Sequence, residues 1–278
     1  MPTTDWAATG PANSRTKNQK TFFIRPFICI RNSKVNMRDE DAKGRGFLAR
    51  CLEWRQQVCE DRSTASRRMQ ILLKSGNSLD LSYPDPNIWT NQDLAERLST
   101  TARWAGSSKW TRPLSVAQHS ILVLRIRGKQ ETALTREQAR YELLHDAEEG
   151  FLGFDPITPL KSCLGDEFNR LCDGLKKAIA TRYRLPALTS QQWTLHKWAD
   201  RCAAASEALH VAGWTRTQIK DELQINAPIL CRDPLYDGSV AEEGYAPWEP
   251  WDARYAAGQF LQTLELLAST PDVLDQAS

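Results

Sequence analysis

The sequence lacks any apolar run long enough to cross a membrane as a helix. The nearest candidate, residues 21–30, is short and contains Arg25 and Pro26, whereas a spanning helix needs roughly 18 or more apolar residues. A strong excess of one charge is also missing, because 36 basic residues are balanced by 34 acidic residues, for a net charge of +2. We therefore expect neither a membrane nor a nucleic-acid polymer as a partner, although the basic beginning of the chain leaves some room for the latter.

Paired cysteines are missing as well. The seven cysteines include no Cys-x-x-Cys motif, and an odd number cannot all be bridged within one chain. Reduced thiols are the simpler interpretation, and they are typical of proteins that reside in the cytoplasm. We therefore expect a cytoplasmic protein.

The chain does have helical patterning and enough apolar residues for one sizeable core. Hydrophobic residues make up 41% and charged residues 25% of the 278 residues, as in ordinary globular proteins. Alternating strand patterns are missing, except for a short hairpin that residues 70–74 could form with 78–82. The sequence predicts an all-α helical bundle with helices at about 91–106, 114–128, 134–150, 165–183, 189–211, 215–224 and 251–269.

Composition divides the chain into three parts. Residues 1–68 are first rich in Thr, Ser and Asn and then basic, and they carry no catalytic motif. Two interpretations of this N-terminal extension remain open: a real extension, which we expect to be partly disordered, or a translation start assigned upstream of Met37 or Met69. Residues 69–270 form the predicted helical domain, and residues 271–278 form a C-terminal tail.

Histidine is scarce, with four residues in the chain, and one of them stands directly before an aspartate. This pair, His145 and Asp146, lies in a segment predicted to be helical. Imidazole and carboxylate groups are ordinary ligands of divalent transition metals. Adjacent residues point about 100° apart on a helix, so the pair needs partners from other segments. His119, in an apolar helical stretch, and Asp200, in a run of small residues, are the candidates.

Each candidate alone has an ordinary structural explanation. A single helical histidine is more often a hydrogen-bonded core or surface residue than a ligand, and Asp200 could simply pair with Lys197 or Arg201. A buried carboxylate nevertheless needs a cation, because an unpaired buried charge is costly or takes up a proton. Taken together, the four residues indicate a metal site whose ligands come from three helices.

Five short segments follow one another in a characteristic order. They are Ala102-Arg103-Trp104, residues 115–120 around His119, residues 143–149 around His145-Asp146, residues 153–161, and Ala199-Asp200. This order resembles the HD-domain metal-dependent phosphohydrolases, and more narrowly the bacterial 5′-deoxynucleotidases. The likeness runs from about residue 76 to the segment 248–251 and the helix after it, around two thirds of the chain. The order of the segments is far more specific than any one of them.

The resemblance implies an HD-domain helical bundle in which four residues hold one divalent metal ion, with water completing its coordination. The four are His119, His145, Asp146 and Asp200. In this family the metal ion lowers the pKa of bound water and polarises a phosphoryl oxygen. The donor set does not decide among Mn, Co, Fe, Zn and Mg as the native metal.

The resemblance also implies roles for residues beside the metal. Glu149 lies four residues after His145 and shares its helix face, and it corresponds to a catalytic acid or base. Its neighbour Glu148 is expected to be a solvated helix residue. Arg103 corresponds to a contact with the substrate phosphate, which suits a bidentate guanidinium group, although on sequence alone it could equally be a charge at a helix C-terminus. Trp104 corresponds to a residue that lines the sugar or base region.

One segment departs from the family pattern. Between Gly153 and Pro159 the chain carries one more residue than the Gly-Asp-Ile/Leu-Pro-x-Pro of the deoxynucleotidases. Asp155 is the acid available in this segment to help position the attacking water, but it is displaced by one position. Lys161 is either a second phosphate contact or only a charge that flanks a helix.

The expected function is metal-dependent hydrolysis of a (deoxy)nucleotide, with release of phosphate from deoxynucleoside 5′-monophosphates as the leading interpretation. Release of triphosphate from deoxynucleoside triphosphates is the alternative within the same fold. A catalytically silent, nucleotide-binding regulatory protein is a second alternative, which the intact ligand set disfavours. The expected partner is a small nucleotide, and the family permits a homodimer.

Overall fold

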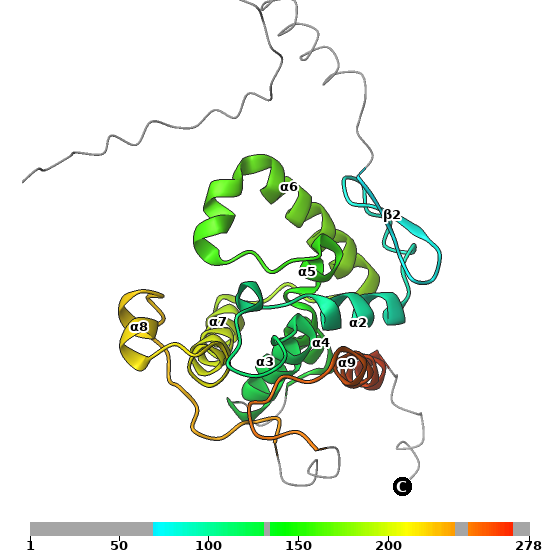
Figure 1. The fold of residues 1–278 in the computed structure, drawn as a ribbon. Coiled ribbons are helices and arrows are strands. Elements are labelled where there is room, and N and C mark those ends of the chain that lie inside the picture. The colour runs from blue at the N-terminus through cyan, green and yellow to red at the C-terminus, as the bar shows by residue number, and fades with distance from the viewer. Residues whose placement is uncertain (1–68, 131–133, 237–243, 269–278) are drawn as a thin grey trace, which may run out of the picture. The chain divides into compact units, whose positions relative to one another are not determined.

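The computed structural model describes residues 69–130, 134–236 and 244–268 (Figure 1). The predicted N-terminal extension, residues 1–68, and the C-terminal tail, residues 271–278, therefore lie outside the described residues. The described residues belong to one compact unit. None of the helices in the described ranges combines the length and the apolar character needed to cross a membrane.

Helices make up nearly all of the regular structure, which confirms the predicted all-α class. A small hairpin precedes them, in which β1 (Gln70–Leu72) pairs antiparallel with β2 (Ser78–Asp80), as predicted. The helices are α2 (Asn91–Thr100), α3 (Val116–Gln130), α4 (Arg136–Leu144), α5 (Ala147–Leu152), α6 (Thr158–Tyr183), α7 (Ser190–Glu207), α8 (Arg216–Asp221) and α9 (Ala253–Ala268). A 3₁₀ turn, η1 (Trp104–Gly106), follows α2, and a π-helical turn, η2 (Ala208–Ala212), continues α7.

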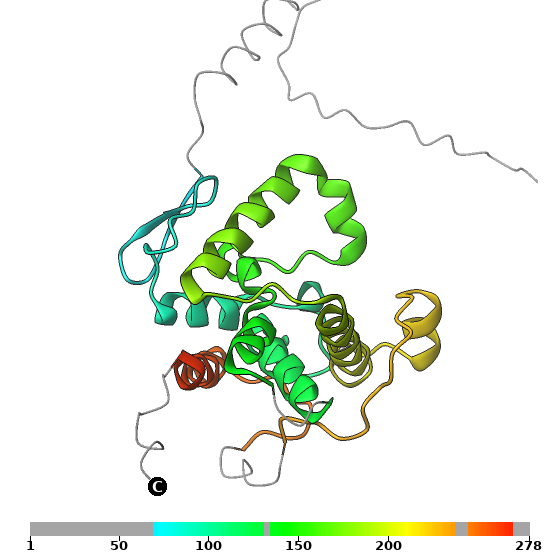
Figure 2. The ribbon, with the colours of Figure 1, turned by 180° about the vertical axis from the view of Figure 1, so that it is seen from behind.

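The main core lies where α2 meets its neighbours. α2 packs against α9, α5 and α3, and α3 packs against α4 and α7 (Figures 1 and 2). Leu98, Phe151 and Phe260 are buried in this core. α2 and α5 approach each other closely at Gly150, because a Cβ atom there would lie 3.0 Å from the Leu98 side chain. This contact fixes α5, and with it the residues just before α5.

Threonine caps explain where several of these helices begin. Thr90, Thr135, Thr189 and Thr215 each accept a hydrogen bond from the backbone N–H three residues later, and the side chain at that position bonds back to the threonine backbone. This reciprocal arrangement satisfies backbone groups that a helix N-terminus leaves without partners. It sets the starts of α2, α4, α7 and α8 within one or two residues of the predicted positions.

Three helices differ from the prediction. The helix predicted over residues 91–106 already ends at Thr100, where the chain becomes extended. The helix predicted over residues 134–150 is interrupted, because α4 ends at Leu144 and Asp146, with φ −114° and ψ 23°, leaves the helical conformation before α5 begins. α6 begins at Thr158, earlier than the predicted residue 165. A kink at Gly165, with φ 79° and ψ −175°, joins its two helical pieces, a backbone conformation that glycine adopts without steric cost.

Removal of the Leu98 side chain tests the contact between α2 and α5. Leu98→Ala should lower the free energy of unfolding by about 2–5 kcal/mol, because it leaves a cavity that the surrounding helices fill only in part. Leu72→Ala is the control, since that side chain is 75% exposed and its loss should change stability by less than about 0.5 kcal/mol. Urea unfolding followed by circular dichroism measures both, and equal effects would contradict the packing described.

Candidate metal centre

The structure brings the four predicted ligands together. His119 lies on α3, His145 and Asp146 lie in the turn between α4 and α5, and Asp200 lies on α7. Asp146 Oδ2 is 3.2 Å from His145 Nε2 and 3.7 Å from His119 Nε2. Asp200 Oδ1 is 3.5 Å from His119 Nε2. These atoms enclose one small centre between three segments that are far apart in the sequence.

The break between α4 and α5 explains how two adjacent residues can serve one centre. On a continuous helix, His145 and Asp146 would point about 100° apart. Because Asp146 leaves the helical conformation, its carboxylate turns back to the imidazole of His145. The prediction of one continuous helix over residues 134–150 is therefore wrong, and the break lies at the two residues that face the centre.

Hydrogen bonds at Nδ1 decide which imidazole nitrogen faces the centre. His145 Nδ1 donates to the carbonyl oxygen of Glu142 at 2.8 Å, and His119 Nδ1 donates to Glu207 Oε1 at 2.6 Å. A carbonyl and a carboxylate only accept, so in each neutral imidazole the proton sits on Nδ1 and Nε2 keeps its lone pair. Within the described part of the chain, both Nε2 atoms are buried without a hydrogen-bond partner. Two such lone pairs beside carboxylates fit a metal ion.

Arg103 forms ion pairs with three carboxylates around the centre. Its Nη1 lies 3.2 Å from Asp155 Oδ2 and 3.6 Å from Asp146 Oδ2, and its Nε donates to Glu207 Oε2 at 3.1 Å. Burial by itself would lower the pKa of Arg103, but Glu207, Asp155 and Asp146 raise it. Because α2 ends at Thr100 and the Arg103 side chain is buried among acids, Arg103 is not a helix C-terminal charge. The extra residue before Pro159 does not keep Asp155 away from the centre.

Glu207 is a residue of the site that the sequence analysis missed. Its carboxylate accepts hydrogen bonds from Arg103, His119 and the Trp104 indole Nε1, the last at 3.2 Å. Burial by itself would raise its pKa, but His119 and Arg103 lower it to about 2. Glu207 follows Asp200 by two helical turns within a run of small, mostly buried residues, a position on the same helix face that could have identified it.

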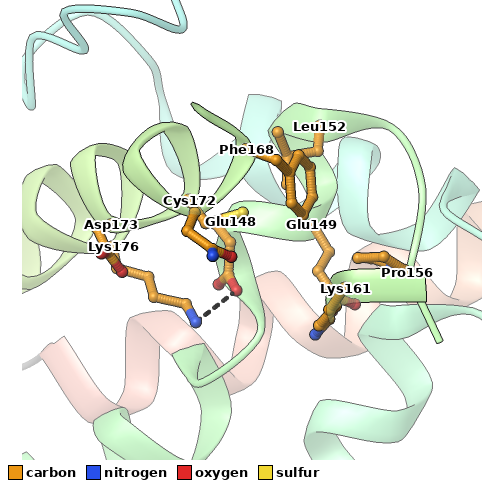
Figure 3. A pocket seen from close by; sticks show the side chains of 10 residues that line it. Glu148, Glu149, Leu152, Pro156, Lys161, Phe168, Cys172, Asp173 and Lys176 are labelled. Atoms are coloured by element: carbon orange, nitrogen blue, oxygen red, sulfur yellow. Dashed lines mark hydrogen bonds and ion pairs between the residues drawn. The ribbon is translucent and has the colours of Figure 1, made fainter. Parts of the chain in front are cut away.

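A cavity of about 330 Å³ lies between α5 and α6 and is lined by Glu148 and Glu149 (Figure 3). Glu149 Oε1 pairs with Lys161 Nζ, and Glu148 Oε1 pairs with Lys176 Nζ, each at 3.1 Å. The prediction that Glu148 is solvated is wrong, because the residue is 2% exposed. α5 is a short helix between α2 and α6, so neighbours cover both of its sides. Burial and the nearby Asp146 raise the pKa of both glutamates.

The histidine side of Asp146 suits a metal better than its glutamate side. Oxygen atoms of Asp146, Glu148 and Glu149 also lie within 4.8 Å of one another. Each glutamate, however, already pairs with a lysine. The group with His119 and His145, which meets the same 4.8 Å limit, offers two imidazole lone pairs, which transition metals favour.

Carboxylates outnumber cations around the centre. Asp200 pairs with Lys197 through Oδ2 at 3.0 Å, as one sequence interpretation expected, while its Oδ1 faces His119. With both histidines neutral, as a metal ion requires, and every other group ionised, the carboxylates of this cluster exceed its cations by two, a difference that a divalent cation would balance. The carboxylates are Asp146, Glu149, Asp155, Asp200 and Glu207, and the cations are Arg103, Lys161 and Lys197.

Binding of a metal ion at pH 7 should release a proton. Burial by itself would lower the pKa of His145, but Asp146 and Asp200 raise it to about 9 in the metal-free protein. A metal binds the neutral imidazole, so protons compete with the metal and the apparent affinity should rise with pH up to about 9. Calorimetry in buffers of different ionisation enthalpy measures the released proton. An affinity that stays constant between pH 6.5 and 9 would contradict this assignment.

Metal content tests the ligand set itself. The wild-type protein should bind one equivalent of Mn(II) or Co(II) per chain, and His145→Ala should lose it because the Nε2 donor is removed. His210→Ala is the matched control, since His210 bonds to the Leu230 carbonyl and stacks on Trp248. Elemental analysis after dialysis measures both variants. Retention of the metal by His145→Ala would remove that residue from the ligand set.

Comparison with known proteins relates the chain to a bacterial protein whose name gives no activity. No model of a known protein family matches the chain. An uncharacterized protein of Rhodobacter capsulatus is 35% identical over 167 residues, which cover 60% of this chain and 84% of that protein. Because the match extends over most of the relative, the chain belongs to the same protein family as this uncharacterized R. capsulatus protein.

Proposed function

We propose that the chain is an HD-domain metal-dependent phosphohydrolase that releases phosphate from deoxynucleoside 5′-monophosphates. The observation that carries the proposal is the pair of buried Nε2 atoms, on His119 and His145, that face a centre bounded by Asp146 and Asp200. The order of the sequence motifs, which resembles the 5′-deoxynucleotidases, supports the substrate class. The Cys163, Cys172, Cys202 and Cys231 thiols are free, which suits the cytoplasmic setting that we propose.

His119, His145, Asp146 and Asp200 would hold one divalent ion. When bound, such an ion lowers the pKa of a coordinated water and offsets charge on phosphoryl oxygens. Two imidazoles with two carboxylates suit Mn, Fe, Co or Zn, and cellular availability decides among them as much as affinity does.

Arg103 is the residue that we propose for the substrate phosphate. Glu207 and Asp155 hold its guanidinium group in place, and its Nη1 lies 3.6 Å from Asp146 Oδ2. A phosphoryl group that reaches the centre would therefore also reach Arg103. A donor that is already oriented stabilises developing charge without the cost of reorganisation. Trp104, which shares the Glu207 carboxylate with Arg103, would line the sugar or base region.

Glu149 is the residue that we propose for proton transfer. Burial, Asp146 and Asp155 raise its pKa well above the usual range of a carboxyl group. A general acid or base works best when its pKa lies near the working pH. The raised pKa of Glu149 therefore brings it closer to that pH. Asp155 would help position the attacking water, and its ion pair with Arg103 keeps it at the centre.

The alternative substrate is a deoxynucleoside triphosphate, whose further phosphates would need positive charge beside the centre. Lys161 and Lys176 both line the cavity of about 330 Å³ beside Glu149 (Figure 3). Lysine ammonium groups bind phosphates as point charges, but Glu149 and Glu148 already pair with these two lysines, so further phosphates would have to displace the glutamates. Product analysis separates the two substrates.

The direct test is turnover of deoxynucleoside mono- and triphosphates by metal-stripped protein reloaded with Mn, Co, Mg or Zn. Chromatography of the products should show inorganic phosphate from monophosphates. Triphosphate release from triphosphates would instead support the alternative. No turnover with any metal, despite stoichiometric metal binding, would contradict both proposals and favour a binding role.

Substitution of Glu149 tests its proposed role in proton transfer. Glu149→Gln should keep the metal and lower kcat by about 10²–10⁴-fold, the range of a lost general acid or base. Glu137→Gln is the control, because Glu137 is exposed on α4 and pairs only with Arg140 among the ion pairs of the described chain. Steady-state kinetics with the best substrate measures both. Full turnover by Glu149→Gln would make the proton-transfer assignment wrong.

A further inference from the structure

A second buried group of ionisable side chains lies beside the candidate metal centre. Arg127 on α3, Glu142 on α4 and His196 on α7 are each 1% exposed. Arg127 Nε donates to Glu142 Oε1 at 2.9 Å, and His196 Nδ1 donates to Glu142 Oε2 at 2.7 Å. These three residues are called the bracing network below. The chemistry proposed above uses none of them.

The bracing network contacts His145 in two ways. The carbonyl oxygen of Glu142 accepts the hydrogen bond from His145 Nδ1. The ring of His196 meets the ring of His145 edge-on, with centroids 5.1 Å apart and an interplanar angle of 69°. Tyr141 and Trp193 also pack on the His196 ring, with centroid distances of 5.3 Å and 5.5 Å. The His196 ring is thereby fixed in place against a candidate ligand.

The spacing along the two helices gives the network a geometric consequence. Glu142 precedes His145 by three residues, and His196 precedes Asp200 by four. Each therefore lies about one helical turn before a candidate ligand on its own helix. The single hydrogen bond between Glu142 and His196 joins α4 to α7 at this level. It thus sets the separation of the two segments just before each of them supplies a ligand.

Stability alone does not account for this network. Buried ionic groups can often be replaced by apolar side chains of similar volume without loss of stability. A fully buried Arg, Glu and His in one cluster therefore need another explanation. Hydrogen bonds have defined directions, so they can fix the relative position of helices more narrowly than apolar contacts do.

We propose that Glu142 and His196 are positioning residues that fix the separation and orientation of His145 and Asp200. This inference rests on the metal centre of the proposed function. Neither residue needs to touch the metal, because partners behind the ligands commonly change metal affinity or activity by about 10–100-fold.

Substitution with Co(II) tests the proposal, because its visible absorption reports the geometry of the ligands. His196→Phe keeps an aromatic ring and removes the donor to Glu142. We expect its Co(II) affinity to fall about 10–100-fold and its absorption bands to shift. His196→Asn places an amide N–H near the position of Nδ1 and should restore most of both properties. Rescue by the conservative variant is an outcome that a merely space-filling role would not give.

His210→Phe provides a matched control. His210 is half-buried, donates from Nε2 to the Leu230 carbonyl at 2.9 Å and stacks on Trp248 at 4.6 Å. Its loss should lower thermal stability and leave Co(II) affinity and absorption unchanged. If His196→Phe does not fold, His196→Met removes the same donor with a more flexible side chain, and the same shift is expected.

Two results would overturn the proposal, and they differ from each other. Wild-type Co(II) affinity and absorption in His196→Phe, or in His196→Met if only that variant folds, would show that the network does not position the ligands. Failure of the wild-type protein itself to bind Co(II) would instead overturn the metal centre and, with it, this inference.

Discussion

Two hydrogen bonds at Nδ1, from His145 to the Glu142 carbonyl and from His119 to Glu207, hold the imidazoles so that their Nε2 atoms face one centre. The rest of the site follows from this orientation. Glu207 stays ionised although it is buried, because His119 and Arg103 lie beside it. Arg103 in turn pairs with Asp155. Removal of one partner from such a buried set leaves another charge uncompensated, which is strongly destabilising.

The packing of the helices determines where the residues of the site lie. α3, the turn between α4 and α5, and α7 each supply candidate ligands, and only packing brings them together. The close approach of α2 to α5 at Gly150 fixes the short helix that follows the His145-Asp146 turn. The site requires the interruption of the helix at that turn, because the interruption lets the adjacent side chains of His145 and Asp146 face the same centre.

The sequence predicted those parts of the structure that depend on local pattern. The all-α class, the hairpin before the first helix and the convergence of His119, His145, Asp146 and Asp200 were all expected from periodicity and motif order. The interruption at Asp146 was not, since local pattern favours a continuous helix there. Burial of Glu148 was missed because α6 covers it from a distant part of the chain.

The contacts behind the ligands were beyond sequence analysis for the same reason. Glu142 and His196 are 54 residues apart, and Arg103 and Glu207 are 104 residues apart. A single sequence shows no period that would pair such residues. The position of Glu207, two turns after Asp200 on one helix, is the sequence feature that could have identified this residue. The bracing network could therefore be identified only from the tertiary structure.

The proposed roles of the other residues all depend on one divalent ion that binds between the two Nε2 atoms. Anomalous diffraction from crystals grown with Mn(II), measured above the Mn absorption edge, locates such an ion directly. We expect a single strong peak bounded by His119 Nε2, His145 Nε2 and carboxylate oxygens of Asp146 and Asp200. A peak on the Glu148–Glu149 side of Asp146, or no peak in this region of a crystal that contains Mn(II), would contradict it.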